Sequence, residues 1–505
     1  MLFNSPLFLF VFLPLVLIGY FLIGRRAGGN AALIFLLLAS FVFYAYSSFF
    51  NFFVFVTSIL TNFLIGILIV KHTKLRAVLV GVGVIWNLAL IGYFKYTGLV
   101  VMTVNELTNA SFAAPYILMP IGISFYTFQQ ITYLMDSRKA GTNEPSLIRY
   151  AIFVSFFPQL IAGPIVHPRE ILPQLPDGGR VRFKIDDFTI GLMFFLIGLM
   201  KKVILADGIA AYATPVFDAA QAGHAPSLFA SWGATFAYTF QIYFDFSGYS
   251  DMAVGLAWMF SIRLPFNFNS PYKASNIIDF WRQWHITLSR FLRDYLYIPL
   301  GGSQDGTARR YVNIFMTMLI GGLWHGASWT FVFWGGLHGI YLIINHIWQH
   351  VFGDYTPGFV AKWSGRIITF FAVAVAWVFF RAESFDAARL MVEGMAGGHG
   401  LIPDTPFYSA QWFSDLFAWF GIRVQPGVPA SGLLLILWCA MSLGIVWLLP
   451  NTQEFLLRHK DEGSSRFVWR PSLFWAMVLG PIFGAGLLYN VLAANKVSEF
   501  IYFIF

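Results

Sequence analysis

Two histidines stand in settings that suit acid–base chemistry, and the first is His325. It lies in Gly321-Gly-Leu-Trp-His-Gly326, where three glycines interrupt an apolar helical pattern and let another group approach the backbone closely. Imidazole has an unperturbed pKa suited to proton transfer near neutral pH, and ionisable residues at membrane depth are usually functional. We therefore predict a catalytic role for His325. The alternative is that this segment is a short solvated loop.

The second histidine, His285, lies in a segment rich in both aromatic and charged residues, 275–302. Apolar residues recur there at steps of three and four, which predicts one amphipathic helix over 276–296 at the cytoplasmic interface, with Ser275 as N-cap. They are Ile277, Trp281, Trp284, Leu288, Phe291 and Tyr295. His285 falls on this apolar face, so we expect it to be at least partly buried. A histidine of the packed core is the alternative reading.

Charged residues supply further candidates. Asp245 and Asp251 interrupt the apolar stretch 227–262, and carboxylates within hydrocarbon face protein or a water-filled cavity, so we expect a helix pair or a broken helix there. The candidates for a substrate or donor channel are Trp324, Trp281, Asp245, Asp251, Arg282 and Arg293. A wider basic set that could hold donor phosphates comprises Lys201, Lys202, Arg282, Arg290, Arg293, Arg309 and Arg310.

Other residues give weaker signals. His338, His346 and His350 are interpreted as structural or interfacial. No acidic residue accompanies His325 at metal-ligand spacing, and Cys439 is the single cysteine, so we expect no metal site, no disulfide and no bound cofactor.

The elements that must position these residues are membrane helices. The 505 residues are 58% hydrophobic and only 11% charged, with a mean hydropathy of +0.68, which is too few charges for a soluble surface. The fold class predicted is an all-α polytopic membrane protein of about 11–14 segments with re-entrant or interfacial helices. The apolar stretches are 6–24, 31–48, 52–70, 77–103, 116–135, 149–165, 186–200, 227–262, 311–322, 329–348, 366–381, 431–449 and 473–494.

Loop charges predict the orientation. Basic residues at 25–26, 71–76 and 138–139 alternate with loops that carry only Glu106, which places the N-terminus outside and the basic loops in the cytoplasm. The basic loop 458–470 should also be cytoplasmic, which puts the C-terminus and 382–430 outside. The net charge of +8 therefore reports topology and does not indicate nucleic-acid binding. The basic loop 167–185 does not fit simple alternation, so one neighbouring segment is expected to be re-entrant.

Six motifs, together with their order, resemble the membrane-bound O-acyltransferase family, and most closely its AlgI-like branch of alginate O-acetylation proteins. They are LMPIGISFYTFQ, FFPQLIAGPI, YFDFSGYSDMA, FWRQWHITLSRFLRDYLYIPLGG, GGLWHGASWTF and WVFFRAES, within residues 118–384. The tail after about 385 matches no motif. We accordingly divide the chain into N-terminal helices 1–140, a catalytic core 141–385 and a C-terminal part 386–505, all within one membrane domain.

The resemblance implies an O-acyltransferase with a central funnel. It places the essential histidine of the family at His325 and the second signature histidine at His285. It also implies acetyl-CoA as donor, membrane lipids as surroundings, and periplasmic acetyltransferase partners of the SGNH type, for O-acetylation of an exopolysaccharide at the bacterial inner membrane. In this hypothesis His325 is the general base that activates the acceptor hydroxyl.

Two other functions remain open at this level. Broken helices and intramembrane carboxylates would also fit a transporter or flippase of an acyl or polysaccharide precursor, although the paired repeats of such proteins are absent. A non-catalytic scaffold for polysaccharide export would leave the Trp-His-Gly break unexplained.

Overall fold

The computed structural model describes residues 1–138, 144–304, 306–353, 358–403, 424–425, 432–457, 469, 471–492 and 500–501. Packing divides the chain into two units. Unit 1 comprises 1–200, 248–266 and 469–505, and unit 2 comprises 201–247 and 267–468. The division predicted at 140 and 385 stays a prediction, because these units describe packing rather than function.

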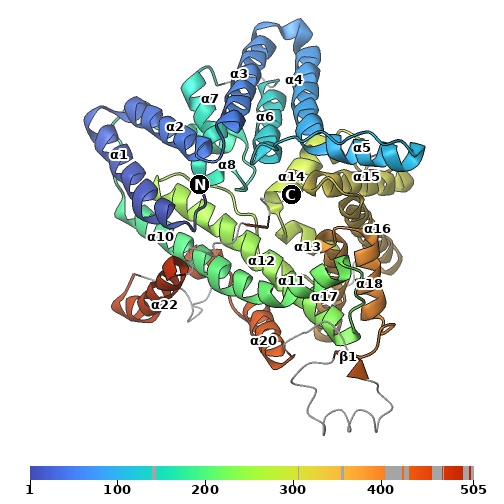
Figure 1. Cartoon of the computed structure of the whole chain (residues 1–505). Helices are drawn as coiled ribbons and strands as arrows, with labels where there is room; N and C mark the ends of the chain where they lie inside the picture. Colours follow the sequence, from blue (N-terminus) through green and yellow to red (C-terminus); the bar gives the residue numbers. More distant parts are fainter. Residues whose placement is uncertain are drawn as a thin grey trace. The chain divides into compact units, whose positions relative to one another are not determined.

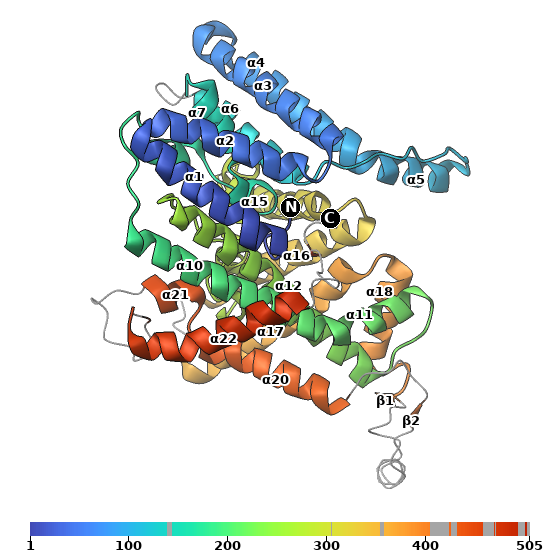
Figure 2. The same cartoon turned by 60° about the vertical axis from the view of Figure 1, so that its left-hand side comes forward.

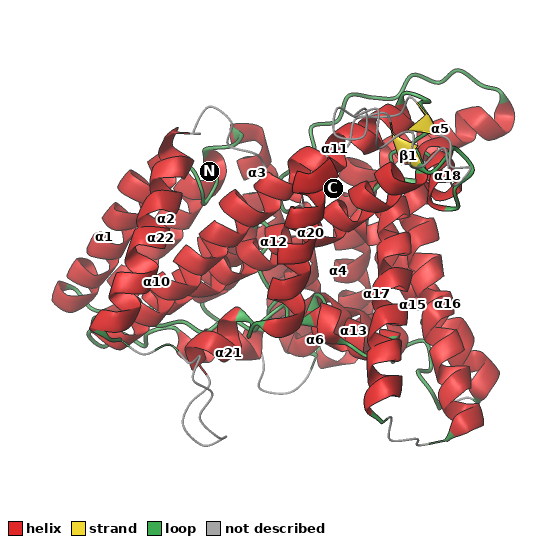
Figure 3. Ribbon diagram, turned by 90° about the horizontal axis from the view of Figure 1, so that it is seen from below, coloured by secondary structure: helices red, strands yellow, loops and turns green. Residues whose placement is uncertain are grey.

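The described residues are mainly helical (Figure 3). In unit 1 the helices are α1 Leu13–Arg26, α2 Gly29–Ala45, α3 Phe49–Lys71, α4 Arg76–Ile91, α5 Thr97–Thr108, α6 Ile123–Ser137, α7 Leu147–Ser155, α8 Phe157–Leu160, α9 Pro168–Ile171, α10 Ile185–Met200 and α22 Leu473–Leu492. In unit 2 they are α11 Asp207–Gln221, α13 Ile277–Gln283, α14 Ile286–Leu292, α15 Thr307–His325, α16 Trp329–Phe352, α17 Phe359–Arg381, α18 Phe385–Met395, α20 Gly432–Leu448 and α21 Thr452–Leu457. Helix α12, Leu228–Met259, belongs partly to each unit.

Shorter elements complete the description. Within the described residues, four π-helical segments continue neighbouring helices at Phe8–Phe12, Gly92–Tyr96, Lys201–Ala206 and Arg293–Tyr297, and 3-10 turns lie at Thr73–Leu75, Leu172–Gln174 and Pro271–Lys273. Two-residue strands, β1 Ile402–Pro403 and β2 Val424–Gln425, pair in parallel.

Six helical stretches of the described part are long and apolar enough to cross a bilayer, which makes the chain a multi-pass membrane protein. They are Phe8–Arg26, Phe49–Lys71, Thr73–Thr108, Ile185–Gln221, Phe359–Arg381 and Leu473–Leu492. Gly29–Ala45 and Leu434–Leu448 are shorter apolar helices. The total of 11–14 segments stays a prediction.

In unit 1, α3, α4 and α6 pack side by side (Figures 1 and 2). Buried amides join them: Asn87 Nδ2 donates to Asn62 Oδ1 at 2.6 Å, and Asn62 Nδ2 donates to Gln130 Oε1. The Ser58 hydroxyl donates to the same Gln130 oxygen at 2.9 Å. Without water in hydrocarbon, such interhelical bonds satisfy the polar groups and fix which helices pair.

The basic loop 167–185 lies on the same side of unit 1 as the basic turn after α1. The Val181 N–H donates to Gly24 O at 3.1 Å, and the Gly29 N–H donates to Gly179 O at 2.7 Å. The apolar stretch 149–165 forms only the nine-residue α7 and the four-residue α8, which are too short to span the bilayer. A re-entrant segment, as predicted, would explain why the loops on either side of this stretch share one side.

The helix break predicted within 227–262 is wrong. Helix α12 continues for 32 residues through Asp245 and Asp251. In unit 2, Asp245 tolerates burial because Lys202 Nζ lies 2.8 Å from its Oδ1, and the same ammonium lies 2.8 Å from Asp207 Oδ1. An ion pair therefore satisfies the carboxylate where a helix break had been expected.

Candidate active site

The chain changes direction at His285, and this corrects the prediction of one helix over 276–296. Helix α13 ends at Gln283, Trp284 is extended, and His285 has a left-handed φ of 42° before α14 begins. The N-cap of α13 is Asn276, whose side chain accepts from the Asp279 N–H at 2.9 Å, and not the predicted Ser275.

Hydrogen bonds to the preceding segment 267–269 hold this break open. The Ile286 N–H donates to Asn267 O at 2.9 Å, and Gln283 O accepts from the Asn269 N–H at 3.0 Å. A continuous α-helix would use both groups internally, in i to i−4 bonds. The tertiary partner therefore replaces helical bonds at the point where His285 must turn inward.

His325 is the last residue of α15, at the turn into α16, and is 4% exposed. Its ring centroid lies 4.9 Å from that of Trp324, 5.1 Å from Trp334 and 5.3 Å from Phe380. The imidazole is thus enclosed by aromatic rings from α15, α16 and α17. Water is largely excluded from such a setting, which strengthens electrostatic interactions there.

Close approach of α15 and α16 makes this enclosure possible. A Cβ at Gly322 would collide with Phe331 O and lie 3.1 Å from the Gly335 Cα. Glycine at both positions lets the two backbones touch, so that Trp334 on α16 reaches His325 at the end of α15. The glycines noted in the sequence therefore act in helix packing, whereas the predicted break is limited to residues 326–328.

The two histidines meet: the ring centroids of His285 and His325 are 6.4 Å apart. His285 is fully buried, with its ring 4.7 Å from Phe246 and 6.0 Å from Trp324. It lies outside the six apolar spans, and burial lowers the pKa of its imidazole to about 3. His285 is therefore neutral at physiological pH.

Trp281, on α13, joins the same cluster through α16. Its indole Nε1–H donates to His338 Nδ1 at 3.2 Å, and its ring lies 5.8 Å from Trp334. His338 is fully buried, with its ring 4.8 Å from that of Trp334. One aromatic side chain, Trp334, consequently contacts both His325 and His338.

Comparison with known proteins shows the family of this chain. The family model of MBOAT, the membrane-bound O-acyltransferase family, matches residues 7–385. This chain belongs to the membrane-bound O-acyltransferase family. It is thus an O-acyltransferase, and its predominantly helical, multi-pass architecture is that expected from the sequence.

Curated relatives act on different polymers. The chain is 42% identical over 431 residues to a peptidoglycan O-acetyltransferase of Helicobacter pylori, covering 79% of this chain and 81% of the relative. It is 41% identical over 404 residues to a probable alginate O-acetylase AlgI of Pseudomonas aeruginosa, covering 78% and 75%. A teichoic acid D-alanyltransferase of Streptococcus thermophilus is 27% identical over 243 residues, 45% of this chain and 57% of that one.

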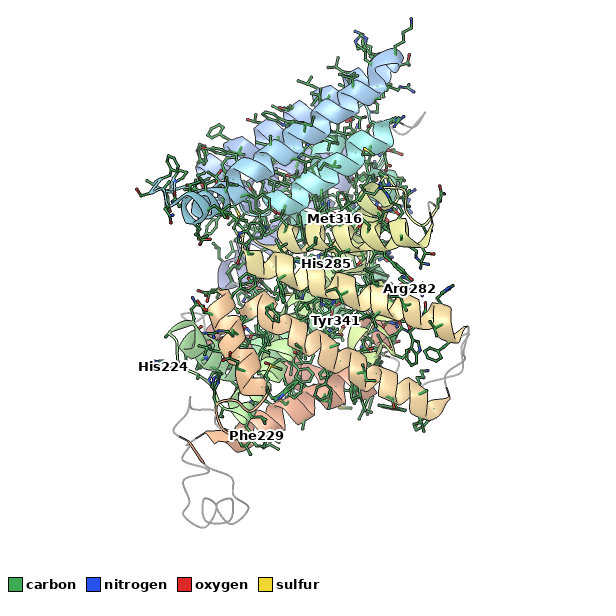
Figure 4. All side chains as sticks on the ribbon, turned by 90° about the vertical axis from the view of Figure 1, so that its right-hand side faces the viewer. His224, Phe229, Arg282, His285, Met316 and Tyr341 are labelled. Carbon is green, nitrogen blue, oxygen red and sulfur yellow. The ribbon has the colours of Figure 1, made fainter. Side chains whose placement is uncertain are left out.

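The cluster of this acyltransferase gathers four predicted site residues, His325, His285, Trp324 and Trp281. Arg282, Arg293 and Asp245 instead pair with other charged side chains. The side chain of Arg282 is 74% exposed and lies 3.5 Å from Asp279, and that of Arg293 is 62% exposed beside Asp294 at 2.8 Å. Figure 4 shows Arg282 toward an edge and His285 among the helices. Asp245 pairs with Lys202, and Asp251 belongs to unit 1.

His338 is the residue to which sequence reasoning gave no part in the site. The available signal was its spacing, four residues after Trp334 on one helix, which places both side chains on the same face. Among the residues that the structure describes, no group of three or more His, Cys, Asp or Glu side chains is arranged to hold a metal ion.

Proposed function

We propose that this O-acyltransferase transfers acetyl groups from cytoplasmic acetyl-CoA toward an exopolysaccharide outside the inner membrane, through a periplasmic acetyltransferase of the SGNH type. The observation that supports it best is the pair of buried imidazoles, His285 and His325, 6.4 Å apart within one aromatic cluster. Two relatives with almost equal sequence identity to this chain are named for different polymers, peptidoglycan and alginate. The proposed polymer is therefore defined only as a hydroxyl-bearing polysaccharide.

In the proposed reaction His325 acts as general base. It takes the proton of the acceptor hydroxyl while that oxygen attacks the carbonyl carbon of the thioester. The new C–O bond forms, the C–S bond breaks, and the departing thiolate receives the proton back from the imidazolium to give free coenzyme A. His285, neutral and fully buried, shapes the reaction centre beside it.

A base contributes typically 10² to 10⁴-fold, so positioning and stabilisation of the oxyanion must supply the rest of the rate. Binding of substrate and partner should survive when the base is removed, because its interaction matures in the transition state. Substitution of His325 should therefore lower turnover and leave substrate binding unchanged.

The test uses His325→Ala and His325→Gln, with His224→Gln as the matched control because His224 is exposed. Transfer of labelled acetyl from acetyl-CoA is measured with purified protein in lipid nanodiscs and the periplasmic partner. Both His325 variants should lose at least about 100-fold in turnover and keep donor binding, since Gln cannot take a proton at neutral pH. The control should match the wild type.

Two outcomes would contradict the proposal. Wild-type turnover by either His325 variant would remove the general-base role. Uptake of an unmodified acyl or sugar precursor into vesicles, with no acetyl transferred, would favour the transporter instead. That alternative has lost one of its grounds, since α12 is unbroken.

A further inference from the structure

An apolar groove of about 480 Å³ lies in unit 1 and is lined mainly by residues of α1 and α10. Its walls carry no polar surface. They are formed by Leu13, Pro14, Leu17, Ile18, Phe21, Phe183, Phe188, Leu192 and Met259. An open groove of this kind, on helices that cross the bilayer, is filled by the hydrocarbon chains of lipids.

Both walls of the groove end at a cation. On α1 the stripe Pro14, Ile18 and Phe21 continues at helical spacing to Arg25, and on α10 Leu192 and Phe188 lead back to the residue at 184. That residue is a lysine, whose carbonyl accepts the Phe188 N–H at 3.0 Å and so keeps the helical register. From 13 to 25 the stripe is about 18 Å long, close to half of the roughly 30 Å hydrocarbon core. The groove therefore has the depth of one leaflet.

The loop before α10 adds more positive charge to this end. Its backbone bond from Val181 to Gly24 holds Arg180 and Arg182 beside the last turn of α1, which ends with Arg25 and Arg26. All four arginines are exposed, and within the described residues none forms an ion pair.

Acidic residues do not neutralise the positive charge of Arg25, Arg26, Arg180, Arg182 and Lys184, which together form the mouth of the groove. Asp187 is engaged by Arg263, 2.7 Å away, which leaves exposed Asp186 as the carboxylate nearest in sequence. Four arginines and one lysine against one free carboxylate give a local excess of positive charge. Guanidinium groups match the geometry of phosphate oxygens, and basic pockets between membrane helices on the cytoplasmic side bind anionic head groups.

We propose that this groove is a binding site for an anionic diacyl phospholipid of the cytoplasmic leaflet. One acyl chain lies along α1 and α10, and the phosphate is held by the arginines at 25, 26, 180 and 182. The site is independent of the proposed acetyl transfer, since none of its residues belongs to the histidine cluster.

The test is lipid binding by native mass spectrometry of the full chain, with dioleoyl phosphatidylglycerol and dioleoyl phosphatidylcholine as probes. The double variant Arg25→Gln/Arg182→Gln removes two charges at the mouth, and Leu17→Trp fills the groove. Lys71→Gln/Lys74→Gln removes the same charge from an exposed basic turn that does not line the groove and is the matched control.

We expect the wild type to bind phosphatidylglycerol more tightly than phosphatidylcholine. The arginine double variant should bind the anionic lipid roughly 25-fold more weakly, about 5-fold for each arginine, and lose the preference for it over phosphatidylcholine. Leu17→Trp should weaken both lipids, and the lysine control should keep wild-type affinity. An equal loss in the lysine control would show unspecific attraction to the membrane and overturn the site. Full competition by glycerol 1-phosphate, with Leu17→Trp unchanged, would show a phosphate site without a lipid and overturn it too.

Discussion

The hydrogen bond between Trp281, on α13, and His338, on α16, fixes the position of α13 relative to the cluster around the two histidines. Because His338 Nδ1 accepts the indole proton, the neutral ring carries its own proton on Nε2. Trp281 lies four residues before His285, so a shift of its ring would be transmitted to the break that holds His285. His338 is therefore expected to act as a positioning residue for this O-acyltransferase.

We predict that His338→Phe lowers kcat for the proposed acetyl transfer by about 10- to 100-fold with little change in KM, because the indole N–H loses its acceptor and the site geometry loosens. His338→Asn retains an acceptor near the position of Nδ1 and should recover most of the rate. Steady-state kinetics on both variants makes the comparison. Equal rates for the two variants would mean that the hydrogen bond has no positioning role.

At the scale of elements, three segments of unit 2 meet at one buried ammonium. Lys202 belongs to the π-helical segment Lys201–Ala206, Asp207 begins α11, and Asp245 lies on α12. The side chains of Lys202 and Asp245 are each 2% exposed, whereas that of Asp207 is 29% exposed. Removing one partner of a buried pair leaves an uncompensated charge, which costs more than the pair itself contributes.

Lys202→Met should therefore destabilise the protein by about 3 kcal/mol, because the buried Asp245 loses its cation, and the double variant Lys202→Met/Asp245→Leu should regain part of that loss. Asp207→Asn, at the more exposed partner, should cost less than about 1 kcal/mol. Thermal unfolding in detergent measures the order of stability of these variants. A double variant less stable than Lys202→Met would show that the pair is not the cause.

For the whole molecule, the central question is which side of the membrane each loop faces. Loop charges predict that the turns after α1 and α3 lie in the cytoplasm and the turn after α5 outside. The hydrogen bonds of Val181 and Gly29 put the loop before α10 on the side of the first turn. The basic loop 458–470 lies largely outside the described residues, so its side stays a prediction.

With Cys439 replaced, a cysteine at position 26, 74 or 182 should resist an impermeant thiol reagent added to intact cells, and one at 108 should react. All four positions are exposed in the structure, so accessibility reports sidedness. Labelling at 182 together with 108, and not at 26, would contradict the placement of that loop. Permeabilised cells, in which all four should react, provide the control.

The sequence by itself determined the class of protein and singled out two histidines as candidate site residues. Few charges and long apolar runs dictate a multi-pass helical fold, because hydrocarbon forbids unsatisfied backbone. Motif spacing identified His325 and His285, and the structure brings their rings within 6.4 Å. These features depend on residue type and local order, which a sequence displays directly.

Tertiary structure alone decided the rest. A helical pattern continued through His285, but bonds from Asn267 and Asn269 replaced the internal helical bonds and broke the helix there. Conversely, glycine and two aspartates indicated a break in α12, but Lys202 pairs with Asp245 and the helix continues. In both places the partner lies outside the three- and four-residue spacing of a helix, so helical periodicity cannot report it. A buried backbone or side-chain polar atom must have a hydrogen-bond or ionic partner, and whether the helix continues depends on whether that partner lies within the helix or elsewhere in the fold.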